Sequence, residues 1–189
     1  TEFLALDHLP PRVVFVGGGF ISFEFAHFAA RLGPAVSTTI LEVAPRPLGP
    51  FDSERVEVLV EASRSEGIDI HTGVNIEAVV KNGSGWVVKT TSDEFEADLV
   101  VHGAGRVAAI DSLNLEAGDV AFTPRGITVD DEMRTTNPRV FAVGDCAATL
   151  QLARVADYEG YVASKNILAA AEGGGGAQIT YRKVPTVLF

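Results

Sequence analysis

The chain has 189 residues, of which 47% are hydrophobic and 21% charged, as in an ordinary globular protein with room for one large domain or two small ones. Its net charge of −10 argues against nucleic acid or an anionic membrane surface as a partner, and no apolar run approaches the roughly 20 residues that span a bilayer. A single cysteine, Cys146, excludes an internal disulfide and a cysteine-rich metal site, and it favours a reducing, cytoplasmic setting.

The first predicted element is a strand at residues 13–16 that runs into three glycines, Gly17, Gly18 and Gly19. Its four consecutive apolar residues are typical of a strand covered on both faces. Gly17 would let the chain turn sharply, and Gly19 would let a phosphate approach the backbone, facing the N–H groups of the following helix. Ser22 is small enough for close packing of that helix on the strand. A tight turn without a ligand is the alternative.

The helix after the glycines is expected from about residue 19 to residue 32, with Gly33-Pro34 ending it. Residues 37–41 form the next predicted strand, which ends at Glu42. A strand, a helix and a second strand in this order predict a βαβ unit with parallel strands. The expected core stripe of the helix consists of Ile21, Phe25, Phe28 and Leu32.

The middle of the chain changes period. Asp52 is a suitable N-cap for a helix over residues 53–65, which Gly67 would close, and residues 68–71 form a short strand. Antiparallel strands are then expected at 74–81, 85–91 and 94–97, with a hairpin turn at 82–85, before a buried strand at 99–102. An antiparallel excursion between parallel strands predicts a mixed α/β domain.

Beyond a boundary near residues 107–114, short strands are expected at 126–129 and 140–143. A long helix at 152–171 and a flexible glycine link at 173–176 follow. Residues 180–189 have a strand-like composition.

Glu42 is the first candidate ligand-binding side chain, because it follows Gly17 by 25 positions, close to the roughly 20 residues of a dinucleotide site. A carboxylate there can accept hydrogen bonds from both ribose hydroxyls of adenosine, and it would repel a 2′-phosphate. NAD is therefore favoured, although Arg46 could partly compensate a phosphate and leaves NADP possible. An exposed glutamate at a strand end is the alternative.

Two further turns carry candidate residues. The turn at 103–106 contains Gly103 and Gly105, which permit close approach of a ligand to the backbone or simply end a strand. Gly144 and Asp145 end the strand predicted at 140–143, where open α/β sheets bind ligands, and the Asp145 carboxylate could bind sugar-alcohol hydroxyls. No metal-binding spacing is present, and structural or exposed positions are expected for His8, His27, His71 and His102.

Taken together, residues 17–24, 105–106 and 140–145 resemble the motifs of the pyridine nucleotide-disulfide oxidoreductases, the two-dinucleotide flavoenzymes that include glutathione reductase and dihydrolipoamide dehydrogenase. Residues 159–167 resemble the helix after the second FAD motif, and 184–189 resemble the opening of the dimerisation domain. The resemblance implies a Rossmann-like FAD/NAD(P)-binding fold with a parallel sheet and an antiparallel β excursion.

The resemblance also implies roles for individual residues. The ring of Phe20 would stand at the gate that covers the flavin until nicotinamide displaces it, and Glu24 would face the flavin–nicotinamide region and pair with a lysine of an absent domain. Cys146 is expected to be a small packing residue. The implied cofactor-binding residues are Gly17, Gly18, Gly19, Phe20, Ile21, Glu42, Gly103, Gly105, Arg106, Gly144 and Asp145.

The implied organisation is an NAD(P)-binding domain at 1–108, the second part of an FAD-binding domain at 109–182 and the start of a truncated dimerisation domain at 183–189. The partners would then be the missing FAD and dimerisation domains, and the intact enzyme would be a homodimer. We expect hydride transfer from NAD(P)H to FAD and on to a disulfide or other acceptor, with this fragment inactive. Two alternatives stay open, a non-enzymatic NAD-sensing module and a nucleoside-binding methyltransferase.

Overall fold

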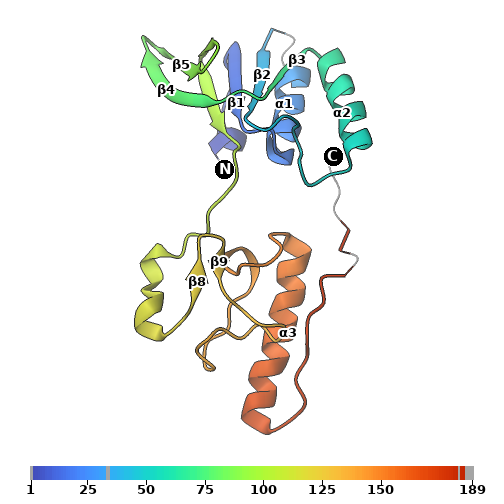
Figure 1. The fold of residues 1–189 in the computed structure, drawn as a ribbon, viewed down its shortest axis with the longest axis vertical. Helices are drawn as coiled ribbons and strands as arrows, with labels where there is room; N and C mark the ends of the chain where they lie inside the picture. Colours follow the sequence, from blue (N-terminus) through green and yellow to red (C-terminus); the bar gives the residue numbers. More distant parts are fainter. Residues whose placement is uncertain (1, 33–34, 183, 186–189) are drawn as a thin grey trace. The chain divides into compact units, whose positions relative to one another are not determined.

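The computed structural model describes residues 2–32, 35–182 and 184–185. The chain forms two compact units, the first ending at Gly105 and the second beginning at Arg106, and each has its own hydrophobic core (Figure 1). The helix end expected at 33–34 and most of the tail expected at 183–189 lie outside the described residues. Of the helices that the structure describes, none combines the length and the apolarity that crossing a bilayer requires.

A parallel sheet forms the centre of the first unit. Its strands stand in the order β3-β2-β1-β7, and every neighbouring pair is parallel. Their bounds are Arg12–Val16 for β1, Ser37–Glu42 for β2, Ile68–Thr72 for β3 and Leu99–His102 for β7. Helix α1, at Phe20–Leu32, joins β1 to β2, which confirms the predicted βαβ unit.

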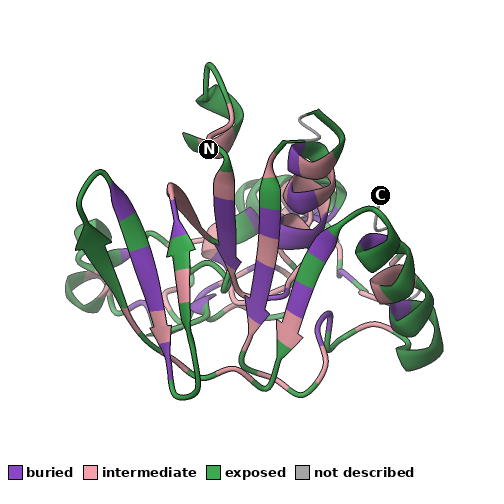
Figure 2. Cartoon of the chain, turned by 90° about the horizontal axis from the view of Figure 1, so that it is seen from above, coloured by how far each residue is buried: buried purple, intermediate pink, exposed green. Residues whose placement is uncertain are grey.

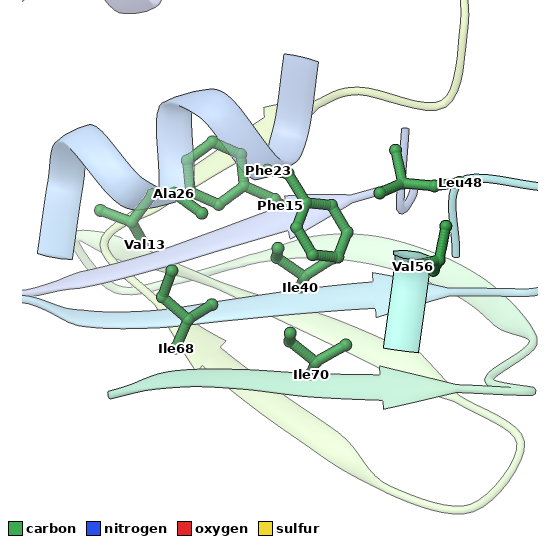
Figure 3. Close-up of a cluster of buried hydrophobic side chains, with 9 residues drawn as sticks. All are labelled: Val13, Phe15, Phe23, Ala26, Ile40, Leu48, Val56, Ile68 and Ile70. Carbon is green, nitrogen blue, oxygen red and sulfur yellow. The ribbon is translucent and has the colours of Figure 1, made fainter. Parts of the chain in front are cut away.

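Helices cover one face of this sheet. Phe23 and Ala26 of α1 pack with Val56 of α2, at Ser53–Ser65, on Phe15 and Ile40 of the sheet (Figure 3). The buried residues of β1 and β2 stand out in Figure 2, as expected for strands covered on both faces. The predicted cap of α2 is confirmed, since Oδ1 of Asp52 accepts a hydrogen bond from the Arg55 amide at 3.1 Å.

An antiparallel sheet covers the other face, with strands β4 at Ile76–Asn82, β5 at Gly85–Thr90 and β6 at Glu94–Ala97. Val88 and Ala97 pack there against Val14 and Leu41. The predicted hairpin turn is confirmed by the pairing of Asn82 with Gly85. Strand β7 is half-buried instead of buried as predicted, because among the described residues β1 is its one strand neighbour.

The buried face of α1 differs from the predicted stripe. Phe28 and Leu32 are 50% and 78% exposed, and Phe25 stacks between Phe3 and Phe28 beside the core. Small side chains instead let the helix approach the sheet closely, so the buried residues are Ser22, Phe23, Ala26 and Ala29.

The second unit consists of short elements and one long helix. They are 3-10 helices η2 at Asp111–Leu113, η3 at Leu115–Gly118 and η4 at Gly144–Cys146, the hairpin of β8 at Phe122–Thr123 with β9 at Gly126–Ile127, and α3 at Ala153–Glu172. The prediction of α3 is confirmed, and Gly173 ends it in the left-handed conformation with φ 74°. Val162 and Ala163 of α3 pack on Met133 and Ile179.

The strands predicted in this unit are shorter or absent. The strand predicted at 126–129 is reduced to β9, and residues 140–143 make one antiparallel bridge, between Phe141 and Arg134. The prediction at 140–143 is therefore wrong. Met133 has a left-handed φ of 63°, which turns the partner segment away and prevents a continued ladder.

Candidate functional site

A cavity of about 390 Å³ opens at the carboxyl ends of the parallel strands of the first unit. In the register of the sheet, Val16 pairs with Leu41 of β2 and with His102 of β7. The carboxyl ends of these three strands therefore lie at the same edge of the sheet. The walls come from the β1–α1 turn, the loop after β2 and the turn after β7. Open α/β sheets bind ligands at this edge, and cavities of this size hold small molecules.

Gly17 makes the sharp turn between β1 and α1. Its φ is +101°, and a Cβ atom there would stand 2.6 Å from both the N and the Cα of Ala104. Its N–H donates to the Leu41 carbonyl at 2.8 Å. Any side chain at this position would therefore push the turn away from the segment after β7 and widen the edge of the sheet.

Gly18 leaves room for the Glu42 side chain. The Gly18 N–H donates to Oε2 of Glu42 at 2.5 Å, and the Ala44 N–H donates to Oε1 at 2.7 Å. A Cβ atom on Gly18 would come within 2.9 Å of Oε2 and 3.0 Å of Pro47 Cβ. The half-buried carboxylate is thus fixed at the cavity wall with one backbone donor on each oxygen, which leaves acceptor capacity on both.

Gly19, unlike Gly18, has room for a Cβ atom. The nearest atom to an added Cβ is the Gly103 carbonyl oxygen at 3.5 Å, an ordinary contact. Helix α1 starts at the next residue, and the first N–H groups of a helix have no partner within the helix. An anion in the cavity would therefore meet free backbone donors and the positive end of the helix dipole.

The predicted residues on α1 lie in different surroundings. Phe20 lines the cavity with 43% of its surface exposed. Ile21 and Glu24 are half-buried and lie outside the cavity lining. Of the three, Phe20 alone is brought to this cavity within the described residues.

Arg46 stands on the loop after β2 and also lines the cavity. Its guanidinium donates to the carbonyl oxygens of Gly49 at 2.8 Å and Phe51 at 3.1 Å. These bonds fold the loop back on itself, so part of the donor capacity of Arg46 serves the loop.

Ser22 occupies the third small position of the glycine motif. It is buried at 1% exposure, and its Oγ has no hydrogen-bond partner among the described residues. A Cβ atom on Gly103, which lines the cavity, would stand 2.0 Å from that Oγ. The expected close packing is therefore confirmed, with Gly103 as the residue that permits it. Gly105 also lines the cavity, in a left-handed conformation with φ +100°.

In the second unit, the structure brings two predicted residues together. Arg106 Nη1 lies 2.9 Å from Asp145 Oδ2, and both side chains are about half exposed. Sequence reasoning placed these two residues in separate motifs and did not foresee the pair. Cys146 follows, and its Sγ donates to the Val143 carbonyl oxygen at 3.3 Å, which fits a packing residue.

Sequence reasoning missed the role of Glu159 in α3, which was noted only as part of a resembling helix. Glu159 is fully buried, and its Oε2 accepts from the Gly144 N–H at 2.6 Å. Its Oε1 accepts from the Tyr181 hydroxyl at 2.8 Å. The pKa of Tyr181 is raised well above its usual range. Burial is the largest cause, and the hydrogen bond to Glu159 and the charge of Glu159 add to it. The available signal was a charged residue between apolar positions of a helix.

Two histidines have partners. His27 Nε2 lies 2.9 Å from Ser63 Oγ, which joins α1 to α2, and His71 Nε2 lies 2.7 Å from Asp69 Oδ2. Burial, with a smaller effect of Arg31, lowers the pKa of His27.

Comparisons with known proteins show which family this chain resembles. The profile of the family described as pyridine nucleotide-disulphide oxidoreductase matches residues 1–160. The chain is 34% identical to a dihydrolipoyl dehydrogenase of Bacillus subtilis, over 98% of this chain and 40% of that protein. It is 35% identical to a glutathione reductase of Burkholderia cepacia, over 95% and 39%.

Solved structures give the same result. The structure of LpdA from Mycobacterium tuberculosis matches with a TM-score of 0.84 and 28% identity, over 98% of this chain and 39% of that one. The HOCl-induced flavoprotein disulfide reductase RclA from Escherichia coli matches with a TM-score of 0.82 and 26% identity, over 93% and 39%. The chain thus spans about 40% of the length of the curated relatives that it matches.

A parallel sheet with a glycine turn at its carboxyl edge defines an α/β protein of the Rossmann-like class, as predicted. The matched profile and the relatives then give the family. The chain belongs to the pyridine nucleotide-disulphide oxidoreductases.

Proposed function

We propose that this chain is the nucleotide-binding portion of an FAD-dependent NAD(P)H oxidoreductase. Residues 1–108 bind the pyridine nucleotide, 109–182 supply the second part of an FAD site, and 183–189 begin a dimerisation domain. The observation that carries the proposal is the Glu42 carboxylate, bonded to the Gly18 amide at the wall of a glycine-lined cavity. We further propose that the intact enzyme is a homodimer and that it is located in the cytoplasm.

The donors and acceptors of the cavity fit a pyridine nucleotide. The amides near Gly19 and the start of α1 suit a pyrophosphate, and the acceptor capacity left on Glu42 suits two ribose hydroxyls. A 2′-phosphate would meet the same carboxylate at close range, while Arg46 is engaged by loop carbonyls. This supports NAD as the preferred nucleotide, with NADP possible.

The second unit fits a part of the flavin. Asp145 can accept hydrogen bonds from the ribitol hydroxyls, and neighbouring amides can contact phosphate oxygens. Phe20 would serve as the gate at the nicotinamide, and Glu24 would pair with a lysine of another domain. The bound cofactors supply the hydride transfer from NAD(P)H to flavin and on to a disulfide or other acceptor, and these residues bind and orient them.

Titration calorimetry with NADH, NADPH and S-adenosylmethionine tests this function. We expect NADH to bind most tightly. A preference for NADPH would overturn the role given to Glu42, and binding of S-adenosylmethionine alone would indicate a methyltransferase. If NADH binds but FAD affinity is the same in wild type and Asp145→Ala, the chain is an NAD-sensing module.

We also propose that residues 1–189 by themselves bind nucleotide without turnover. The described residues hold one glycine-rich βαβ unit, so the FAD half-site lacks a phosphate site of its own and should bind flavin weakly. The chain mixed with FAD and NADH should leave the nicotinamide absorbance unchanged. Robust protein-dependent oxidation would contradict this.

A further inference from the structure

We propose that Glu159 is a positioning residue that holds the Gly144–Asp145 turn in the conformation needed for flavin binding. This inference rests on the proposed function, because it takes Asp145 as the flavin contact. Glu159 itself would not touch the flavin.

The contact between Glu159 and the turn is short and buried. Glu159 is 0% exposed in the middle of α3, and its Oε2 accepts from the Gly144 N–H at 2.6 Å. The other oxygen accepts from the Tyr181 hydroxyl at 2.8 Å. Each carboxylate oxygen therefore has its own donor from a different segment.

Two hydrogen bonds compensate the burial of the Glu159 carboxylate. Burying a charged group is unfavourable unless hydrogen bonds compensate it, and none of the ion pairs formed among the described residues includes Glu159. An ionised carboxylate presents a separate acceptor oxygen to each of the two donors and has no N–H or O–H group of its own to oppose them. The Tyr181 hydroxyl is protonated at neutral pH even at the ordinary tyrosine pKa of about 10, so it can donate to Glu159.

The bond to Gly144 acts on Asp145 through the backbone. Gly144 has a left-handed φ of +71°, and a Cβ atom there would stand 3.3 Å from Ala156 Cβ. The turn closes on itself through the Ala147 N–H, which donates to the Gly144 carbonyl at 2.9 Å. Because Asp145 is half exposed, burial does not fix it. Its direction is set by this turn and by Arg106.

Amide exchange and an FAD titration, both followed by NMR on the 189-residue chain, test the inference. In wild type we expect the Gly144 amide to exchange slowly. Glu159→Met keeps the volume and removes both acceptors, so exchange should become at least about tenfold faster and FAD affinity about tenfold weaker. Glu159→Gln keeps one acceptor for Gly144 and should restore both properties.

Tyr181→Phe is the matched control, because it loses the bond to the other oxygen of the same carboxylate. We expect it to lower the melting temperature and to leave FAD affinity within about twofold. Equal loss of FAD affinity in Tyr181→Phe and Glu159→Met would overturn the inference, because general packing would then explain both. NADH affinity should stay unchanged in every variant.

Two further outcomes separate this inference from the proposed function. If Asp145→Ala weakens FAD binding and Glu159→Met does not, the inference alone fails. If Asp145→Ala has no effect on FAD binding, or wild type does not bind FAD, the proposed flavin site fails and the inference fails with it. Should Glu159→Met not fold, fast exchange of the Gly144 amide in wild type or in Glu159→Gln would still overturn the inference.

Discussion

The three glycines between β1 and α1 differ in what their missing side chains permit. Gly17 needs a left-handed backbone and close contact with Ala104. Gly18 has no room for a side chain, because the Glu42 carboxylate fills that space. Gly19 has ordinary space around it and faces the cavity, so its role depends on what binds there.

Gly18→Ala should weaken NADH binding by about tenfold, because the new methyl group displaces Glu42 from the Gly18 amide. Calorimetric titration measures this. Gly49→Ala is the matched control, since Gly49 also lines the cavity but has nothing within 4 Å of an added Cβ. Its NADH affinity should stay within about twofold. Equal losses in the two variants would contradict the role given to Gly18.

Ser22→Ala should raise the free energy of unfolding by about 1 kcal/mol, because it removes a buried hydroxyl without a partner and puts a better helix former in α1. Ser63→Ala is the matched change in α2. There the hydroxyl donates to the Leu59 carbonyl oxygen and contacts His27, so its loss should lower stability by about 1–3 kcal/mol. Urea unfolding compares the two, and destabilisation by Ser22→Ala would contradict the first expectation.

At the scale of elements, we expect the contact between α1 and α2 to depend on pH through His27. Ser63 Oγ donates to Leu59, so it accepts from the His27 Nε2–H, and His27 Nδ1 is left buried without a partner among the described residues. Protonation would place a charged N–H at that buried atom, and the positive charge of Arg31 would disfavour it further. This geometry explains why the pKa of His27 lies below its ordinary value.

The lowered pKa means that the folded state binds fewer protons than the unfolded state. The contribution of neutral His27 to the free energy of unfolding should be fully present above the unfolded pKa of about 6.5. It should be lost as the pH falls through the lower pKa of His27 in the folded state. Urea unfolding between about pH 8 and pH 5 should show this decline in wild type and a smaller one in His27→Gln. His71→Gln, in an exposed pair with Asp69, should keep the wild-type decline. Parallel pH profiles for wild type and His27→Gln would contradict the account.

The elements of the first unit follow from local patterns. Apolar runs, the Asp52 cap and the 82–85 turn act over a few residues, so their prediction needed no tertiary information. The buried face of α1 could not be predicted in the same way. Its small residues are buried because they let the helix approach the sheet closely, which the apolar pattern alone does not show. Residues 140–143 failed as a strand because pairing depends on a segment that Met133 bends.

At the scale of the whole molecule, motif spacing predicted which residues line the cavity of the first unit. Gly17, Gly18, Gly19 and Glu42 stand where strands β1 and β2 end, which the βαβ order implies. The bond between Gly18 and Glu42 could not be foreseen, because it depends on atomic distances. Glu159 was missed for a similar reason, since its partners lie 15 and 22 residues away along the chain.

The central claim is that the cavity of the first unit binds a pyridine nucleotide. The most direct test is an NMR titration of the isotope-labelled chain with NADH, following each backbone amide. The account predicts that the largest shifts fall on Gly18, Gly19 and Phe20, the start of α1, and on Glu42. Saturable binding with shifts elsewhere and none at these amides would contradict it.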